Sequence, residues 1–186
     1  MSRTLIEAFD PGKHDRKAFS CGVAAIDNYF KFTAHKLSKA GNVRVFVMTD
    51  EDAETLIGFY ALNAHAVEYT DLPEAFARDR PRHGNIPAAY ISSMIGVDRR
   101  FQGRGYGGDL LADALKGILR ASEHVAIAVV ILDVFDCGDP DQVARRLRLY
   151  GRYGFRPLPS NPLRLYLPLA TVRKADEQSQ TRDEGA

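Results

Sequence analysis

The sequence predicts an α/β fold of the α+β kind, with a mixed sheet and helices on both of its faces. Three observations predict it: β-branched and aromatic segments alternate with amphipathic ones, one later apolar run suits an interior strand, and a glycine-dense turn joins a strand to a helix. The chain has 186 residues, 45% of them hydrophobic and 26% charged, which is enough for one substantial core and short for two. We therefore expect a single domain over 1–172 and a polar, disordered tail over 173–186.

The first half of the chain reads as a strand, a helix and a meander. A short strand is expected at 5–9, and the helix at 24–40 has its apolar residues on one face and Gly41 as its stop. Extended segments follow at 44–49 and 56–63, and 64–69 continues extended. We interpret 70–87, which contains three prolines, as a loop with a short helix at 74–77.

The second half repeats the alternation. The stretch 89–98 is extended and mostly apolar, and it leads through the glycine turn into a helix at 109–120. The nearly unbroken apolar run 125–135 is typical of an interior strand covered on both faces. A helix at 142–152 and a last strand at 163–169 complete the predicted fold.

The turn itself is the most informative stretch. Gly103, Gly105, Gly107 and Gly108 lie between the strand and the helix, so several backbone N–H groups can gather at a helix N-terminus, where a pyrophosphate binds well. The spacing of three of these glycines also satisfies the dinucleotide pattern Gly-x-Gly-x-x-Gly. The acid which that pattern expects about twenty residues later falls near Glu123, in a polar loop before a strand rather than at its end.

Two motifs resemble those of the GNAT acetyltransferases. The run Gln102-Gly103-Arg104-Gly105-Tyr106-Gly107 resembles the acyl-CoA signature Gln/Arg-x-x-Gly-x-Gly/Ala, and Tyr150 to Phe155 resembles Tyr-x-x-x-Gly-Phe. The resemblance implies the GNAT fold: a mixed, mostly antiparallel sheet with a splayed pair of parallel strands. It implies acetyl-CoA as co-substrate, no metal, and a cofactor site made by Ile95, Gly96, Val97, Gln102, Gly103, Arg104, Gly105, Tyr106, Gly107 and Gly108.

The resemblance also implies the catalytic chemistry. An amine attacks the thioester, an N–H near Val97 holds the oxyanion, and Tyr150 is the acid that protonates the leaving sulfur. A phenol of pKa about 10 keeps its proton at neutral pH and is close to a thiol of pKa about 8.5. The stretch 91–94 carries no carboxylate to serve as a base. An α-amine of pKa about 8 needs a base less than a lysine does, which favours an α-amine acceptor, with Glu68, Asp71 and Glu74 left open as bases.

A narrower resemblance is to the tRNA-acetylating toxin branch of the GNAT superfamily. It lies in 19–30, 43–47, 57–62, 86–87 and 162–167, together with the turn and Tyr150, and so covers nearly the full length to about Leu169. The resemblance implies acetylation of the α-amine of aminoacyl-tRNA, which blocks translation, and a small DNA-binding antitoxin as partner. The chain departs from the branch in Ser93 to Asp98 and in a longer, more acidic stretch at 136–141.

Charge is nearly balanced overall but unevenly distributed. The formal net charge is +1, yet basic residues cluster at 31–44, at 78–83 and at 145–156. The candidates for tRNA contact in the first and third clusters are Lys36, Lys39, Arg44 and Arg148. Each cluster can equally be a solvated helix face or loop.

Other features narrow the class of protein. Cys21 and Cys137 have no metal-ligand or disulfide spacing, and we interpret both as packing residues. No run of eighteen apolar residues and no secretion signal occurs, so a cytoplasmic protein is expected. A homodimer is left open. Two other functions also stay open: a GNAT enzyme that acts on a small amine or a protein N-terminus, and a CoA-binding or nucleic-acid-binding module without turnover.

Overall fold

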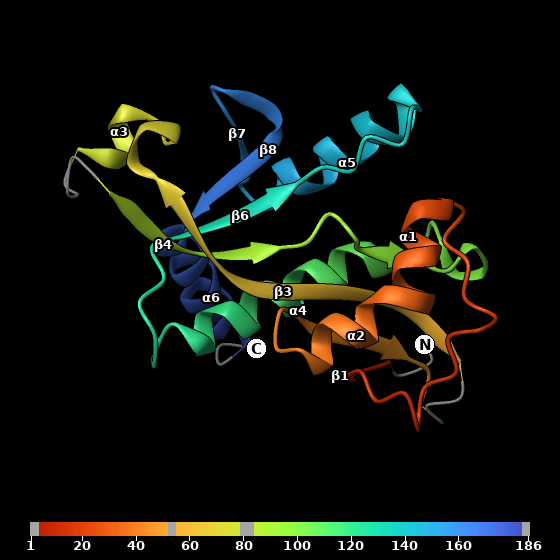
Figure 1. Cartoon of the computed structure of the whole chain (residues 1–186). Helices are drawn as coiled ribbons and strands as arrows, with labels where there is room; N and C mark the ends of the chain where they lie inside the picture. Colours follow the sequence, from red (N-terminus) through yellow and green to blue (C-terminus); the bar gives the residue numbers. More distant parts are fainter. Residues whose placement is uncertain (1–3, 52–54, 79–83, 184–186) are drawn as a thin grey trace. The chain divides into compact units, whose positions relative to one another are not determined.

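The computed structural model describes residues 4–51, 55–78 and 84–183. The chain forms two compact units, one of residues 1–63 with 92–114 and one of residues 64–91 with 115–186 (Figure 1). The boundary falls inside one strand, β3 (Leu56–Glu68), and one helix, α4 (Tyr106–Ala121). The single domain over 1–172 stays a prediction. No helix within the described ranges has the length and apolarity needed to span a bilayer.

The first unit contains an antiparallel sheet in which β2 lies between β1 and β3. Its strands β1 (Leu5–Ala8) and β2 (Arg44–Thr49) match the predicted ones, and β3 is one continuous strand through 68, in agreement with the prediction that the chain continues extended after 63. The short β5 (Gly96–Val97) pairs antiparallel with β3. The predicted extended stretch 89–98 is therefore interrupted at 92–95, between β4 and β5.

Helices cover both faces of β3 in the first unit. The predicted helix at 24–40 consists of α1 (Ala24–Asn28), the π-helical turn η1 (Tyr29–Thr33) and α2 (Ala34–Lys39). Phe30 of η1 stacks on Phe59 with ring centroids 4.1 Å apart. At the preceding residue of the strand, a Cβ on Gly58 would lie 2.7 Å from Leu110 of α4. Successive strand residues face opposite sides, so the two helical layers lie on opposite faces, as the sequence predicts (Figure 1).

The second unit carries the strand order β3-β4-β6-β8-β7, with residues 64–68 as its share of β3. Strand β4 (Asn85–Ile91) is parallel to β6 (Val129–Asp133), and the register ends at Ile91 and Leu132. Strand β8 (Asn161–Pro168) runs antiparallel to β6, and β7 (Arg156–Leu158) antiparallel to β8. The helices are α3 (Glu74–Ala77), α5 (Pro140–Arg152) and α6 (Leu169–Asp183), with short 3-10 turns at Tyr69–Asp71 and, in the first unit, Arg99–Phe101.

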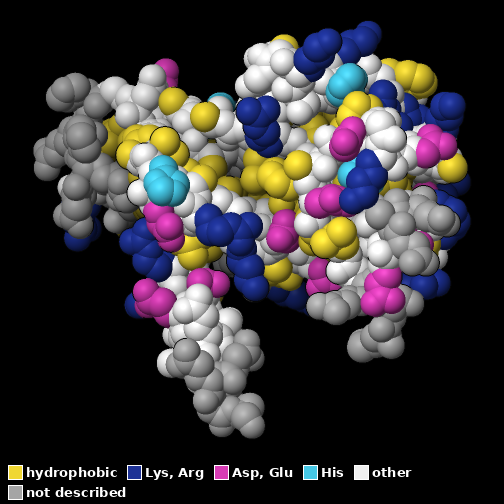
Figure 2. Space-filling view, turned by 90° about the horizontal axis from the view of Figure 1, so that it is seen from below, with side chains coloured by type: hydrophobic (Ala, Val, Ile, Leu, Met, Phe, Trp, Pro, Cys, Tyr) yellow, Lys and Arg dark blue, Asp and Glu magenta, His cyan; other side chains and the backbone are white. Residues whose placement is uncertain are grey.

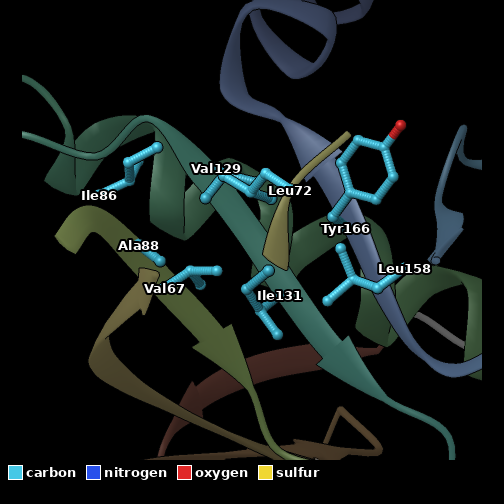
Figure 3. Close-up of a cluster of buried hydrophobic side chains, with 8 residues drawn as sticks. All are labelled: Val67, Leu72, Ile86, Ala88, Val129, Ile131, Leu158 and Tyr166. Atoms are coloured by element: carbon cyan, nitrogen blue, oxygen red, sulfur yellow. The ribbon is translucent and has the colours of Figure 1, made fainter. Parts of the chain in front are cut away.

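The core of the second unit confirms an interior strand. Val129 to Leu132 are fully buried, so neither face of β6 meets solvent. One face packs into a cluster with side chains from β3, β4, β7 and β8 (Figure 3). Its members are Val67, Leu72, Ile86, Ala88, Val129, Ile131, Leu158 and Tyr166.

Several predicted boundaries are wrong. The loop expected to reach Pro87 ends earlier, because β4 begins at Asn85. The strand expected at 125–135 covers only 129–133: Val125 is 60% exposed, and its N–H donates to Ala121 O at 3.1 Å, which extends the end of α4. Strand β7 was not expected, because Pro157 and Pro159 on either side of Leu158 look like strand breakers.

The C-terminal segment also differs from the prediction. Residues 173–183 continue α6 rather than forming a disordered tail, and 184–186 lie outside the described residues. The first turn of α6 is anchored by buried Leu169 and Val172. The polar remainder contains neither proline nor glycine before Gly185, and Gln180 donates to Asp176 one turn earlier at 2.9 Å, so local contacts favour continuation of the helix.

Candidate functional site

The turn before α4 has the properties of an anion site. Gly103 and Gly105 have φ of +79° and +91°, and nothing lies within 4 Å of a Cβ built at either position. Over the described part of the chain, the N–H groups of Gly103, Arg104 and Gly105 have no backbone acceptor within hydrogen-bonding distance. These donors stand at the start of a 16-residue helix, where partial positive charge favours a phosphate.

The remaining turn residues divide into two kinds. Tyr106, Gly107 and Gly108 form the first turn of α4, and the N–H of Gly108 already donates to Gly105 O at 2.8 Å. The Arg104 guanidinium lies over the ring of Phe101, 5.5 Å from its centroid, on an exposed residue. Arg104 therefore adds an exposed positive charge beside the open N–H groups.

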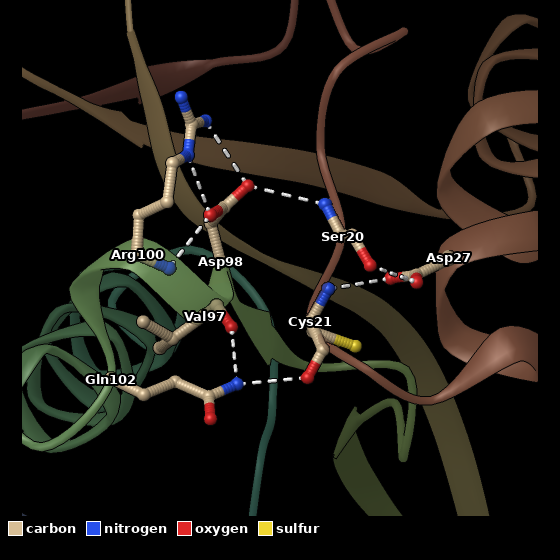
Figure 4. A network of polar contacts seen from close by, with 7 residues as sticks. All are labelled: Ser20, Cys21, Asp27, Val97, Asp98, Arg100 and Gln102. Atoms are coloured by element: carbon tan, nitrogen blue, oxygen red, sulfur yellow. Dashed lines mark hydrogen bonds and ion pairs between the residues drawn. The ribbon is translucent and has the colours of Figure 1, made fainter.

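A buried carboxylate fixes the strand end that enters the turn. Asp98 is 2% exposed and accepts hydrogen bonds from Ser20 N at 3.1 Å and from the backbone and guanidinium of Arg100 (Figure 4). Burial alone would raise the pKa of Asp98, but the hydrogen bonds from Arg100 and Ser20 outweigh burial, and the net shift of its pKa is downward. The carboxylate stays charged and holds loop 19–22 against the turn.

Gln102 has a role that the acyl-CoA motif did not predict. Its amide nitrogen donates to Cys21 O at 2.8 Å and to Val97 O at 2.9 Å (Figure 4). Loop 19–22 is itself held by Asp27, which accepts from Ser20 Oγ and Cys21 N. Gln102 therefore positions the turn through its side-chain nitrogen; the sequence signal for this role was the Phe-Ser-Cys-Gly segment at 19–22.

The backbone of β5 presents polar groups on the edge away from β3. Asp98 N donates to Ile57 O at 2.8 Å, and Val97 lies opposite Gly58. Hydrogen-bonded and non-bonded pairs alternate along an antiparallel ladder, so both polar groups of Val97 point away from β3. The Val97 carbonyl accepts from Gln102, and the Val97 N–H points away from β3 without pairing to that strand. Gly96 is paired with Phe59, and Ile95 lies in no strand.

Tyr150 belongs to the second unit, near the end of α5. Asp139 caps the start of the helix, its carboxylate accepting from the N–H groups of Asp141 and Gln142, and Pro140 is the first helical residue. It ends in the predicted way, because Gly154 has φ of +89° and Tyr150 O accepts from Phe155 N. Tyr150 is 3% exposed, and burial raises the pKa of its phenol to about 12, against a smaller opposite effect of Arg146.

The candidate tRNA contacts are exposed, whereas Arg146, in the same basic cluster as Arg148, is held by hydrogen bonds within the protein. Lys36, Lys39 and Arg44 lie on the surface of the first unit and Arg148 on that of the second. Arg146 instead donates to Phe135 O at 3.0 Å and Cys137 Sγ at 3.3 Å, so Cys137 is a hydrogen-bond acceptor rather than a packing residue alone. Figure 2 shows Lys and Arg interspersed with Asp and Glu on one face. Most of the basic cluster at 78–83, from residue 79 onward, lies outside the described residues.

A polar network in the second unit was missed by the sequence analysis. Arg164 lies 2.6 Å from His65 Nε2 and 3.7 Å from Asp133 Oδ1, and Tyr90 donates to Asp133 Oδ2 at 2.9 Å. The four residues come from four different strands, so no local pattern links them. The open base candidates Glu68, Asp71 and Glu74 are exposed in the same unit. No group of three metal-ligating side chains occurs among residues 4–51, 55–78 and 84–183.

Comparison with solved structures shows the same fold. A crystal structure of a KacT mutant superposes with a TM-score of 0.81 and 21% identity, covering 92% of this chain and 98% of that one. A structure of AtaT complexed with acetyl-methionyl-tRNAfMet gives a TM-score of 0.81 and 22% identity, covering 93% and 99% of the two chains. The predicted fold class, a mixed and mostly antiparallel sheet with helices, is confirmed.

Sequence relatives identify the family. A probable toxin TacT of Sinorhizobium fredii is 58% identical over 172 residues, 92% of this chain and 94% of the relative. A tRNA-acetylating toxin of Mycobacterium tuberculosis is 30% identical over 159 residues, 86% and 89% of the two chains. The sequence matches no protein-family model. With such identity over nearly its whole length, the chain belongs to the family of GNAT-fold, tRNA-acetylating toxins.

Proposed function

We propose that this protein is an acetyl-CoA-dependent N-acetyltransferase that acetylates the α-amine of aminoacyl-tRNA and so blocks translation. The observation that carries the proposal is the identity with a tRNA-acetylating toxin over 86% of the chain. Structural neighbours agree with it: AtaTR has been solved bound with acetyl-CoA, and AtaT has been solved with acetyl-methionyl-tRNAfMet.

The turn before α4 fits the diphosphate of acetyl-CoA. Its open N–H groups at Gly103 to Gly105 and the guanidinium of Arg104 supply donors and positive charge, and the glycines leave room for close approach. Acetyl-CoA supplies an acetyl group activated as a thioester. The proposed cofactor residues also include Ile95, Gly96, Val97, Tyr106, Gly107 and Gly108, with Gln102 acting by holding the turn in shape.

The proposed reaction exchanges a C–S bond for a C–N bond. The amine nitrogen attacks the acetyl carbon, and the N–H of Val97 donates to the carbonyl oxygen as it gains negative charge. The C–S bond then breaks with its electron pair on sulfur, and Tyr150 gives its proton to that sulfur. Because the pKa of Tyr150 is raised to about 12, the phenol is present as an acid at every physiological pH. The proton lost by the amine goes to water, and the Tyr150 phenolate takes a proton back from water before the next turnover.

The absence of a carboxylate at 91–94 supports an α-amine as acceptor. Such an amine, of pKa about 8, is partly neutral at pH 7, whereas a lysine of pKa about 10.4 is almost wholly charged. Lys36, Lys39, Arg44 and Arg148, all exposed, are the proposed tRNA contacts. The proposed compartment is the cytoplasm, where charged tRNA and acetyl-CoA occur together.

An antitoxin is the proposed protein partner. A mutant of AtaT has been solved bound to the C-terminus of the antitoxin AtaR, and KacTA has been solved as a DNA complex. We expect the antitoxin of this chain to suppress acetylation and to bind DNA.

The test is transfer of a labelled acetyl group to charged tRNA. Purified protein, labelled acetyl-CoA and a panel of aminoacylated tRNAs should give label in at least one tRNA, in alkali-labile linkage through the aminoacyl ester, with none in the uncharged controls. Label on small amines or protein N-termini but on no charged tRNA would replace the proposed acceptor. Acetyl-CoA binding without transfer to any amine would favour a binding module instead.

A further inference from the structure

We propose that the first unit carries a second RNA-binding site, a pocket that takes an unpaired nucleotide with a base on Phe32 and phosphates on the surrounding lysines. The pocket has a volume of about 770 Å³ and lies between loop 11–17 and the π-helical turn η1. That volume lies within the range of about 300–1,000 Å³ that is common for small-ligand sites, and so suits a nucleotide. None of the residues assigned above to acetyl-CoA or tRNA lines it.

The pocket is strongly cationic. Lys13, Arg16, Lys17 and Lys31 line it, and Asp15 is the one carboxylate among the lining residues of the described chain. Asp15 accepts from the backbone N–H of Lys17, and Glu7 outside the lining pairs with Lys13 and His14. No carboxylate among the described residues lies within ion-pairing distance of the Lys17 or Lys31 ammonium. These two charges are open to an anionic ligand.

The exposed ring of Phe32 indicates that the anionic ligand also carries a planar base. Its side chain is 66% exposed, and it is the one aromatic among the exposed large hydrophobic residues of the described chain. Its neighbour Phe30 is fully buried, so the chain has core positions for phenylalanine in this helix and leaves Phe32 outside them. An exposed ring among cations is the arrangement on which unpaired bases stack while their phosphates are neutralised.

The pocket is held in shape by groups other than those that would bind the ligand. Arg16 donates from Nε to Lys31 O at 2.8 Å and lies 5.2 Å from the centroid of Phe9, which ties the loop to η1. His14 is fully buried and accepts from Asp10 N at 3.0 Å. A single π-helical turn inside an α-helix often marks a functional site, and here it contributes both Lys31 and Phe32.

An unpaired RNA strand fits better than a duplex or an acidic peptide. A duplex offers phosphates but hides its base faces, so Phe32 would contribute nothing. An acidic peptide would use the lysines but has no planar face to match the ring. The choice of RNA also rests on the proposed function, because a tRNA brings unpaired nucleotides at its 3′ end and in its loops.

The test is direct RNA binding by the full chain. Fluorescence anisotropy with a labelled single-stranded RNA of twelve nucleotides, a blunt RNA duplex and an uncharged tRNA is measured for Lys17→Ala/Lys31→Ala, Phe32→Ala and Phe32→Tyr. The matched charge control is Lys116→Ala/Lys174→Ala, two exposed lysines of the second unit. Thermal unfolding of each variant checks that it is folded.

We expect the double lysine variant to bind single-stranded RNA about tenfold more weakly and to lose about 1.4 from the log–log salt slope, the loss for two phosphate contacts at about 0.7 each. Phe32→Ala should weaken the single strand about tenfold and leave the duplex unchanged, and Phe32→Tyr should keep full affinity. The control should change neither. Equal losses in the control, or no effect of Phe32→Ala on binding of the single strand, would overturn the proposal.

These results separate this site from the proposed function. If charged tRNA is acetylated while the pocket variants bind RNA normally, the pocket proposal fails alone. If the pocket variants lose RNA binding while no charged tRNA is acetylated, the acceptor assignment fails and the pocket stands.

Discussion

Tyr150 is a phenol that is kept from solvent and also kept protonated. Burial raises the pKa of Tyr150 to about 12. The phenol is therefore a weaker acid than free tyrosine, but it carries its proton at every physiological pH. Such an acid suits a leaving thiolate, because proton transfer from a positioned donor to the sulfur accelerates cleavage of the C–S bond.

Replacement of Tyr150 by phenylalanine should lower kcat about 10²- to 10⁴-fold, the usual contribution of a general acid, and leave acetyl-CoA affinity unchanged. Steady-state kinetics and calorimetry measure the two effects. In the unmodified enzyme, kcat/KM should rise with pH through the pKa of the amine, about 8, with no decline below about pH 10. An unchanged kcat in the phenylalanine variant would remove Tyr150 from the chemistry.

Single residues were predictable where a local pattern fixes them. Tyr150, Gly154, Gly103 and Gly105 follow from short motifs, and the structure confirms the left-handed conformation of Gly154 at the end of α5. The clamp made by Gln102 was not predictable, because its acceptor Cys21 is 81 residues away in the sequence. A motif identifies the residue, but the role of its side chain depends on hydrogen-bond partners that are distant in the sequence.

The proposed acetyl-CoA site of β5, the turn and α4 binds through backbone N–H groups, so binding should be sensitive to substitution of one glycine. Gly105→Glu puts a negative side chain beside the open N–H groups and should abolish acetyl-CoA binding by calorimetry. A matched control is Gly41→Glu, also at positive φ (+78°) with nothing within 4 Å of its Cβ. Both variants should lose about 1–2 kcal/mol of stability from backbone strain. Equal acetyl-CoA affinity in the two would refute a phosphate site at the turn.

The strands of the second unit are joined by a network that depends on pH. Burial, and secondarily the charge of Arg164, lower the pKa of His65, while Asp133 opposes the shift. The folded state therefore binds fewer protons than the unfolded state, so stability is full above the unfolded pKa of about 6.5 and falls as pH drops below it.

His65→Gln tests this dependence, because glutamine can still accept from Arg164 but does not titrate. Urea denaturation at pH 7.5 and pH 5.0 should show a smaller loss of stability in the variant than in the unmodified chain. The same loss in both would mean that other groups cause the acid sensitivity.

Elements were predicted better than their ends. The helix at 74–77 and the strand at 44–49 match their predicted limits, because turn and pattern signals bound them on both sides. Strand β6 is shorter than its apolar run, because Val125 completes the turn that ends α4. The π-helical turn η1 could not be read from periodicity, since Ile26, Phe30 and Ala34 keep a spacing of four that suits an ordinary helix.

Over the whole chain, alternating strands and helices and the resemblance at two motifs were enough to predict the fold class. The division into two compact units was not predictable, because its boundary falls inside β3 and α4, where the sequence shows no break. The helix at 173–183 was missed because its composition is polar, and polar composition alone does not distinguish an exposed helix from a disordered tail.

A chain that stops after Arg173 should therefore fold normally. The removed part of α6 is polar and largely exposed, so stability should change by less than about 0.5 kcal/mol. Leu169→Ala, at a residue that is 5% exposed, should instead cost about 2–4 kcal/mol. Thermal and urea unfolding measure both. A large loss on truncation would show that the distal turns of α6 carry packing energy.

The close approach at Gly58 restricts which residues evolution can place at this position. A methyl group there would lie 2.7 Å from Leu110 Cδ1 and 2.8 Å from the carbonyl oxygen of Gly96, and a main-chain oxygen cannot rotate aside as a side chain does. At position 96 the same methyl would meet its neighbours at 3.2 Å or more, and those neighbours are all side chains. A randomised library selected for activity should return glycine alone at 58 while admitting alanine at 96.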